Sequence, residues 1–426
     1  DGTTNLDAVD VDGAVNFAAD VTFADGADII TASAGTSNFR AGVNAGNSIA
    51  SGGNYNTVVG DEAGTAITTG DNNTLFGMRA GDAITTSSSN VAIGADALSG
   101  DTLGSRSVAI GQSALEVQNF TSATNTYNIA VGFNAGAAIT TATENTIVGS
   151  LAADALTTGG SITAIGKDAL GTSQDGNGNT ALGYRALYDA TSGARNVGLG
   201  EQGGRGITTG NDNIGVGTQS FYAACTGSAN IGLGYRSFFS ATSAASNVGI
   251  GYQSLSDMNS GTENVAVGYR ALPHVSTGDS NIGIGIQTGD GDRGVALTTG
   301  ASNILMGRQV DVAAADNSYC GVFGVHAVGK GSSTGYFSFN DGAIYQGNNN
   351  ANWTTTSDIR IKKNIVDSNI GLEELKKIQV RNFEYRTKDE ITEVPSHAAI
   401  NKQGVQVGVI AQEIQTVLPE IVNEES

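Results

Sequence analysis

The 426 residues include 41 acidic and 21 basic side chains, which gives a formal net charge of -20. This charge disfavours a nucleic-acid-binding function, because phosphate recognition needs a concentrated basic face. Glycine is abundant, at 61 residues, while the two cysteines are too few for a disulfide framework. No run of eighteen apolar residues is present, so we expect no membrane insertion.

Residues 1–37 alternate apolar and polar side chains over short runs, as in Val9 to Val15 and Val21 to Phe23. Such alternation is typical of exposed strands. We expect an N-terminal β-stalk that gains its core from other copies of the chain. The chain begins at Asp1 without a signal-like segment, and we expect the natural N-terminus to lie upstream.

Residues 38–330 contain a 17-residue repeat. Its clearest mark is an Asn that recurs every 17 residues, at positions 179, 196, 213, 230, 247, 264 and 281. Extended in both directions, the repeat has sixteen copies from Asn56 to Cys320, with longer intervals of 21 residues after Ser107 and 22 after Asn281. We number the positions of a copy from its first residue, which is usually Asn. The residue four positions later is Gly in all sixteen copies.

A short fixed period indicates units that bury their apolar faces by stacking on one another. Position three is always bulky and apolar, position one is usually Thr, Val or Ile, and position two is often Ala or Gly. Positions one and three therefore share one side of a short strand, and position two faces the other. We predict a mainly β protein whose shaft is a parallel β-solenoid with two short strands and two corners in each 17-residue coil.

The Asn and Gly columns have structural explanations. Stacked Asn side chains form amide ladders that satisfy backbone groups at a corner, and we prefer this interpretation to ligand binding. The Gly at position four supplies the positive φ or the close packing that a corner requires.

The two longer repeats predict loops that protrude from the shaft. The first insertion carries Phe120, a candidate receptor contact, and the second contains Gly289-Asp-Gly-Asp-Arg-Gly294. This acidic segment is either a plain loop or a weak Ca²⁺ site, but it lacks a full ligand set. We expect no metal and no cofactor.

A column of Tyr and Arg side chains follows the Gly in several coils. It consists of Tyr184, Arg185, Tyr235, Arg236, Tyr252, Tyr269 and Arg270. Rings and guanidinium groups on a rod could bind the sugar rings of a receptor. The same column could instead form by packing between coils, and the sequence leaves both explanations open.

A neck with hairpin-like turns is predicted for residues 331–356, and the 17-residue period then ends. Residues 357–426 hold 9 of the 21 basic side chains. We predict an amphipathic helix from Ile370 to Arg386, a strand from Val405 to Ile410 and a second helix from Ala411 to Leu418. These elements indicate a separate, small α+β domain.

The last 70 residues carry four ordered motifs: Ser357-Asp-Ile-Arg-Ile-Lys-Lys-Asn-Ile365, Gly371-Leu-Glu-Glu-Leu375, Phe383-Glu-Tyr385 and Gly408-Val-Ile-Ala-Gln-Glu413. Together they resemble the endosialidase-type intramolecular chaperone at the C-terminus of phage tailspikes and tail fibres. The family domain continues into a long C-terminal helix, so the domain here is expected to be truncated. In the shaft, Asn90-Val-Ala-Ile-Gly94 and Ser107-Val-Ala-Ile-Gly111 resemble the left-handed β-roll repeats of trimeric YadA-like adhesin heads.

The chaperone resemblance implies a domain that drives trimer assembly and then cleaves itself off. Carried over to this chain, Ser357 is the nucleophile, Lys362 is the general base and Thr356-Ser357 is the bond that is cut. Burial and the cationic neighbours Arg360 and Lys363 favour a neutral lysine, and Asp358 completes the cluster. We expect no turnover of an external substrate, and the domain is either released or retained.

The sequence therefore predicts a homotrimeric viral tail fibre or tailspike that is made in the host cytoplasm and carried on the virion. Its expected partners are a host surface glycan or outer-membrane receptor and other tail or baseplate proteins. Two alternatives stay open. A polysaccharide-degrading tailspike would need two carboxylates in a cleft, and a cellular trimeric adhesin would need a membrane anchor.

Overall fold

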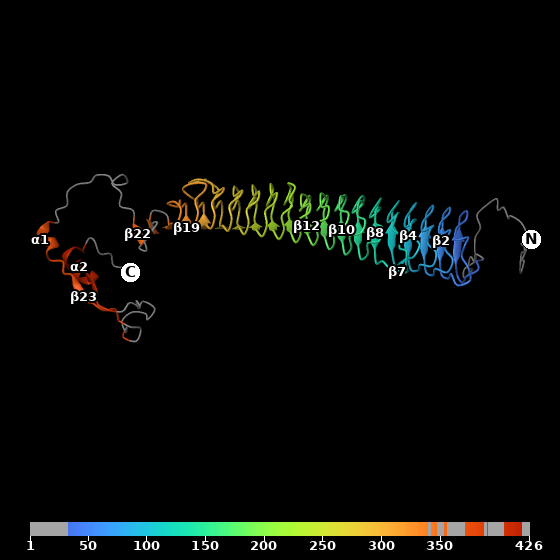
Figure 1. Ribbon diagram of the computed structural model, residues 1–426, viewed down its shortest axis with the longest axis horizontal. Helices are drawn as coiled ribbons and strands as arrows, with labels where there is room; N and C mark the ends of the chain where they lie inside the picture. Colours follow the sequence, from blue (N-terminus) through green and yellow to red (C-terminus); the bar gives the residue numbers. More distant parts are fainter. Residues whose placement is uncertain are drawn as a thin grey trace, which may run out of the picture. The chain divides into compact units, whose positions relative to one another are not determined.

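The computed structural model describes residues 33–339, 342–346, 353–355, 371–386, 390 and 404–419. The chain divides into two compact units, Asp1–Thr356 and Ser357–Ser426, which are considered separately (Figure 1). The β-stalk predicted for residues 1–37 lies outside the described residues except for its last five. None of the described helices is long and apolar enough to cross a membrane.

The first unit is a stack of short parallel strands, one for each coil, which confirms the predicted β-solenoid. Neighbouring strands pair in a register of 17 residues, so that Thr180 lies opposite Val197 and Leu182 opposite Leu199. The strands of the stack are β1 (Phe39–Ala41), β2 (Thr57–Val59), β3 (Thr74–Phe76), β4 (Val91–Ile93), β6 (Val108–Ile110), β8 (Ile129–Val131), β9 (Thr146–Val148), β10 (Thr163–Ile165), β11 (Thr180–Leu182), β12 (Val197–Leu199), β13 (Ile214–Val216), β14 (Ile231–Leu233), β15 (Val248–Ile250), β16 (Val265–Val267), β17 (Ile282–Ile284), β18 (Ile304–Arg308) and β19 (Gly321–Val325). A separate pair, β5 (Gly104–Ser105) and β7 (Thr124–Asn125), forms at the first insertion.

The prediction of two strands per coil is wrong, because the second segment of each coil is a series of turns. Positions six and eight take positive φ values, as at Asp96 (59°) and Leu98 (55°). A residue in this left-handed region cannot continue an extended strand. Backbone hydrogen bonds still join the coils there, since Leu98 N donates to Ala114 O at 2.9 Å.

The structure adds a seventeenth coil at the start of the shaft. Asn38 is buried, and its Oδ1 accepts a hydrogen bond of 2.8 Å from Asn56 N. The interval from Asn38 to Asn56 is 18 residues, and position two is Arg40 in place of a small or apolar residue. Because of these two differences, the first coil does not match the 17-residue pattern and was not predicted from the sequence.

The Asn column forms the predicted amide ladder. Asn213 N and Nδ2 donate to Asn196 Oδ1 at 2.9 and 3.2 Å, and Asn213 Nδ2 also donates to Gly227 O at 2.9 Å. Where one Asn follows another, the amide thereby ties its own corner to the preceding coil. The buried polar groups are satisfied within the protein, which explains why so polar a residue recurs in the interior.

The Gly at position four is required by both its conformation and its surroundings. Gly183 has a φ of 134°, and a Cβ added to it would lie 2.4 Å from the Gly200 carbonyl oxygen of the next coil. No other residue fits a corner where backbones of successive coils approach so closely.

The core is a narrow file of side chains from positions two, seven, eight and eleven of the coils. Large and small residues compensate between positions two and eight. Phe238, at position eight, is fully buried and lies against Gly232 and Gly249 at position two. The interior therefore has room for only one large side chain between these two columns.

Beyond the last coil, the sheet changes direction. β20 (Gly335–Phe339) pairs in parallel with β19, and β21 (Gly342–Gln346) and β22 (Trp353–Thr355) continue the sheet in antiparallel order. These strands occupy the predicted neck.

The second unit contains two short helices and one strand pair in its described residues. They are α1 (Leu372–Leu375), β23 (Arg381–Phe383), β24 (Gln406–Gly408) and α2 (Ala411–Val417). The helix predicted from Ile370 to Arg386 is wrong over most of its length, because Arg381–Phe383 pairs in antiparallel fashion with β24. This pairing supplies backbone partners that an isolated amphipathic helix lacks. The predicted strand and second helix correspond to β24 and α2.

Candidate functional site

Three of the four tyrosines in the Tyr–Arg column stack directly on one another, and Tyr184 lies three coils away from them. The ring centroids of Tyr235 and Tyr252 are 5.2 Å apart, and those of Tyr252 and Tyr269 are 5.1 Å apart, with interplanar angles of 20° and 11°. Both faces of the Tyr252 ring and one face each of Tyr235 and Tyr269 are thus covered by neighbouring rings, while these three residues are 37–47% exposed. A sugar ring that stacks on an aromatic side chain needs an open face, and this ladder presents mainly ring edges.

Two arginines of this column, Arg185 and Arg236, lie between two aromatic columns. Arg236 Cζ lies 5.1 Å from the ring of Tyr235 and 4.8 Å from that of Phe239. Arg185 lies in the same way between Tyr184, at 5.2 Å, and Tyr188, at 5.1 Å. Sequence analysis missed the second aromatic column, although Tyr188, Tyr222 and Phe239 all stand at position nine of their coils.

Among the other candidate receptor contacts, Phe120 is buried, and Arg185 and Arg270 lie beside aspartates. Phe120 is only 6% exposed, so its ring is not accessible to a receptor. Arg270 turns away from the tyrosines and forms an ion pair of 2.9 Å with Asp290. Arg185 lies 3.3 Å from Asp168.

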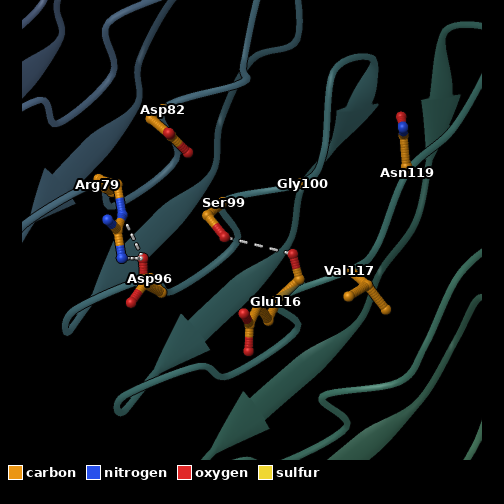
Figure 2. A pocket seen from close by; sticks show the side chains of 8 residues that line it. All are labelled: Arg79, Asp82, Asp96, Ser99, Gly100, Glu116, Val117 and Asn119. Carbon is orange, nitrogen blue, oxygen red and sulfur yellow. Dashed lines mark hydrogen bonds and ion pairs between the residues drawn. The ribbon is translucent and has the colours of Figure 1, made fainter.

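A polar groove of about 470 Å³ opens beside the first insertion (Figure 2). It is lined by Arg79, Asp82, Asp96, Ser99, Gly100, Glu116, Val117 and Asn119, which come from three successive coils. Arg79 and Asp96 form an ion pair of 2.7 Å on one side. Asp82 Oδ1 is buried without a hydrogen-bond partner. Burial raises the pKa of the Asp82 carboxyl, while a backbone hydrogen bond and the charge of Arg79 lower it.

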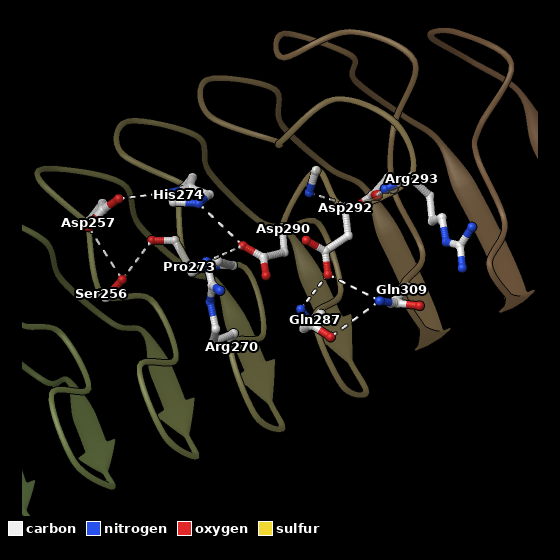
Figure 3. A network of polar contacts seen from close by, with 12 residues as sticks. Ser256, Asp257, Arg270, Pro273, His274, Gln287, Asp290, Asp292, Arg293 and Gln309 are labelled. Atoms are coloured by element: carbon white, nitrogen blue, oxygen red, sulfur yellow. Dashed lines mark hydrogen bonds and ion pairs between the residues drawn. The ribbon is translucent and has the colours of Figure 1, made fainter.

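The second insertion is held against the shaft by a network of carboxylates (Figure 3). His274 Nδ1 lies 2.7 Å from Asp257 Oδ2, and its Nε2 lies 3.3 Å from Asp290 Oδ1. Asp290 has a side chain that is 1% exposed, and it also pairs with Arg270. Burial raises the pKa of the Asp290 carboxyl, and the charge of Arg270 opposes this effect.

Protein donors also engage the remaining carboxylates at the loop. The carboxylate of Asp311 accepts backbone hydrogen bonds from Gly291, Arg293 and Gly294 at 2.7–3.0 Å. Asp292 accepts from Gln287 and from Gln309. No group of three potential metal ligands forms among the residues that the structure describes. Protein groups thus engage the carboxylates of Asp290, Asp292 and Asp311 at this loop.

In the second unit, a bidentate ion pair joins the strand that contains Phe383 to the helix that contains Glu413. Arg381 Nε and Nη2, on β23, donate to the two carboxylate oxygens of Glu413, on α2, at 3.0 and 2.9 Å. This hydrogen bonding lowers the pKa of Glu413. Phe383 and Tyr385 meet edge to face at 5.4 Å. The predicted catalytic residues Ser357 and Lys362, together with Thr356, Asp358, Arg360 and Lys363, lie outside the described residues.

Comparison with known families assigns this second unit. Residues 357–423 match the family model described as chaperone of endosialidase. The matched segment begins at Ser357, which is also the first residue of the second compact unit. The chain thus joins a β-solenoid shaft to an endosialidase-type chaperone domain. A search of curated proteins found no match.

Proposed function

We propose that this protein is a homotrimeric phage tail fibre or tailspike that attaches the virion to the surface of its host. The observation that carries the proposal is one shared boundary. The chaperone match starts at Ser357, and the first compact unit, with its solenoid shaft, ends at Thr356. A chaperone domain placed directly after a long repetitive shaft has a clear physical task, because repeated coils can pair in the wrong register unless their ends are aligned.

The chaperone then removes itself by cutting one peptide bond in two steps. Lys362, as a neutral amine, accepts the proton of the Ser357 hydroxyl, and Ser357 Oγ attacks the carbonyl carbon of Thr356. The C–N bond breaks, its nitrogen leaves as a protonated amine, and an ester joins Thr356 to Ser357 Oγ. Water hydrolyses the ester, which leaves a carboxylate on Thr356 and restores the serine hydroxyl. Asp358, Arg360 and Lys363 provide the charged surroundings.

Cleavage is tested by denaturing electrophoresis of the full chain beside Ser357→Ala and Lys362→Ala, with Asn364→Ala as a matched control. We expect wild type and the control to release a fragment that begins at Ser357, and the first two variants to stay intact. Mass spectrometry of the fragment locates the cut. Full-length product in all four proteins would overturn autocleavage, and cleavage of Lys362→Ala would overturn the role of the lysine.

Host contact is proposed at the polar groove beside the first insertion. Its hydroxyl, amide, carboxylate and guanidinium groups suit a hydroxyl-rich sugar, and its volume is within the range of small-molecule sites. One guanidinium group and three carboxyl groups line the groove, so neutral sugars are favoured over anionic ones. Titration calorimetry with neutral and sialylated oligosaccharides tests this. Asp82→Asn should weaken neutral-sugar binding, and Asp175→Asn, at an exposed position outside the groove, should not. Equal binding by both variants would contradict the assignment.

The groove also favours a second candidate, glycan hydrolysis. Hydrolysis needs one carboxyl group that is protonated near neutral pH and a second that is ionised. Burial raises the pKa of Asp82, as a general acid requires, and Glu116 lies in the same groove. Release of oligosaccharides from host envelope by wild type, and its loss in Asp82→Asn and Glu116→Gln, would establish this activity.

A further inference from the structure

The exposed apolar side chains of the shaft gather on one side. Between Asn38 and Lys330, a range that the structure describes throughout, 23 large hydrophobic side chains are exposed. Of these, 21 stand at position one, three or five of a coil or immediately before its first residue, and Val117 and Val295 are the two exceptions. We call these four columns the apolar ribbon.

The ribbon is the outward side of the strands. Position two faces the core and is fully buried, as at Leu75 and Ile147, so the alternation of a strand points positions one and three away from the core. Phe76 and Leu182, at position three, are 57% and 47% exposed. Neither position one nor position three carries a charged side chain in any of the seventeen coils, although the chain as a whole has a net charge of -20. The charged side chains of the ribbon all stand in its two flanking columns, four at position five and five immediately before the first residue of a coil.

Such a surface needs a partner, because monomeric soluble proteins rarely expose a continuous apolar patch larger than about 600 Å². Taking roughly 60 Å² for each exposed side chain, the ribbon holds on the order of 1,200 Å². A stable protein interface uses about 800 Å² from each partner. The ribbon is therefore large enough to hold a stable assembly together.

The repeat identifies the partner. Contact along the whole ribbon requires a surface with the same coil spacing over the same length, and another copy of this chain provides it in parallel and in register. We infer that the apolar ribbon is the surface through which copies of the shaft pack against one another. This inference rests on the trimeric fibre proposed above and names the face that forms its interface.

The inference also reassigns the tyrosine ladder. Tyr235, Tyr252 and Tyr269 stand at position five, two residues beyond the outward-facing position three. Their stacked faces are already covered, and their exposed edges continue the ribbon. These tyrosines belong to the interface between copies, and the receptor is contacted elsewhere on the shaft.

The test compares matched pairs of substitutions by sedimentation equilibrium. Leu182→Arg with Ile284→Arg places charges on the ribbon, at side chains 47% and 38% exposed. Val117→Arg with Val295→Arg is the control, at 47% and 41% exposed but off the ribbon. All proteins carry Ser357→Ala so that cleavage does not change the mass. We expect three times 43.0 kDa for wild type and the control, and at least a tenfold weaker association for the ribbon variant.

Three results would overturn the inference: dissociation of the control as well as the ribbon variant, a ribbon variant that stays fully associated, or a wild-type mass of 43.0 kDa. If the ribbon variant stayed fully associated, the proposed trimer would be unaffected, and only the assignment of its interface to the apolar ribbon would be wrong. The cleavage assay is scored separately, so the two proposals fail independently. Hydroxyl-radical footprinting of wild type gives a measurement without substitutions, and Tyr252 should be several-fold less reactive in the assembled protein than in dissociated, folded chains.

Discussion

Gln118 replaces the asparagine that is missing from the ladder at Ser107. Its Nε2 donates to Ser107 Oγ at 2.9 Å, and its Oε1 accepts a hydrogen bond of 2.8 Å from Asn128 Nδ2. The glutamine comes from the first insertion, which follows the only coil that begins with serine. The insertion thus restores the amide that this coil lacks, and Gln118 also donates to the buried carboxylate of Asp101 at 2.5 Å.

Gln118→Leu should destabilise the shaft by about 2–4 kcal/mol, because it leaves several buried polar groups without their partner. Urea unfolding followed by circular dichroism measures the change. Gln253→Leu is the matched control, at a half-buried position outside the ladder, and should change stability by about 0.5 kcal/mol or less. If both variants lost the same free energy of unfolding, the hydrogen bonds of Gln118 would not contribute specifically to the stability of the shaft.

Gly249→Ala should destabilise the shaft by about 1–3 kcal/mol through overpacking. The added Cβ would lie 2.7 Å from Phe238 Cε2 of the preceding coil. Phe238→Leu in the same protein should recover part of the loss, because Ala181 already follows Leu170 in this arrangement. Thermal unfolding of the two single variants and the double variant completes a mutant cycle. A strictly additive double variant would contradict direct packing between these positions.

Gly183→Ala should cost more than Gly249→Ala, since the substitution meets both a φ of 134° and a carbonyl oxygen 2.4 Å away. Backbone on both sides is fixed by the stack and cannot move aside. We expect a loss of about 3 kcal/mol or more. Hydrogen exchange should show the coils around residues 183 and 200 opening first; protection equal to that of wild type would rule this out.

Asp101 should make the shaft less stable as the pH rises. Burial raises the pKa of this carboxyl, and the hydrogen bond from Gln118 only partly opposes the effect. A raised pKa means that the folded state favours the protonated form, so its stabilising effect is complete below the unfolded pKa of about 4 and is lost as the pH rises through the folded value.

Urea unfolding at several values between pH 4 and pH 7 measures this dependence. The stability of Asp101→Asn relative to wild type should increase with pH over this range, because asparagine does not ionise. Comparing the two proteins cancels the titration of the other carboxylates. A difference that is constant with pH would show that Asp101 does not titrate in this window.

Local patterns were enough to predict the period, the Asn ladder and the corner Gly, because each follows from what a stacked coil demands of one residue. The same reasoning failed for the second strand of each coil and for most of the helix from Ile370 to Arg386. The left-handed conformation at Asp96 and Leu98 depends on contacts with neighbouring coils, and Arg381 joins a strand only because β24 lies beside it. Neither cause can be read from a short window of sequence.

The sequence by itself determined that the shaft is a stack of 17-residue coils and that a chaperone-like domain begins at Ser357. Which side of each strand faces the core was decided by the tertiary structure. Positions one and three are bulkier than position two, yet they point outward, because position eight fills most of the narrow interior, as Phe238 does beside Gly249. The interior volume available to positions two and eight together, rather than the hydrophobicity of either, determined which side of each strand faces the core. The apolar ribbon is the side that remained exposed.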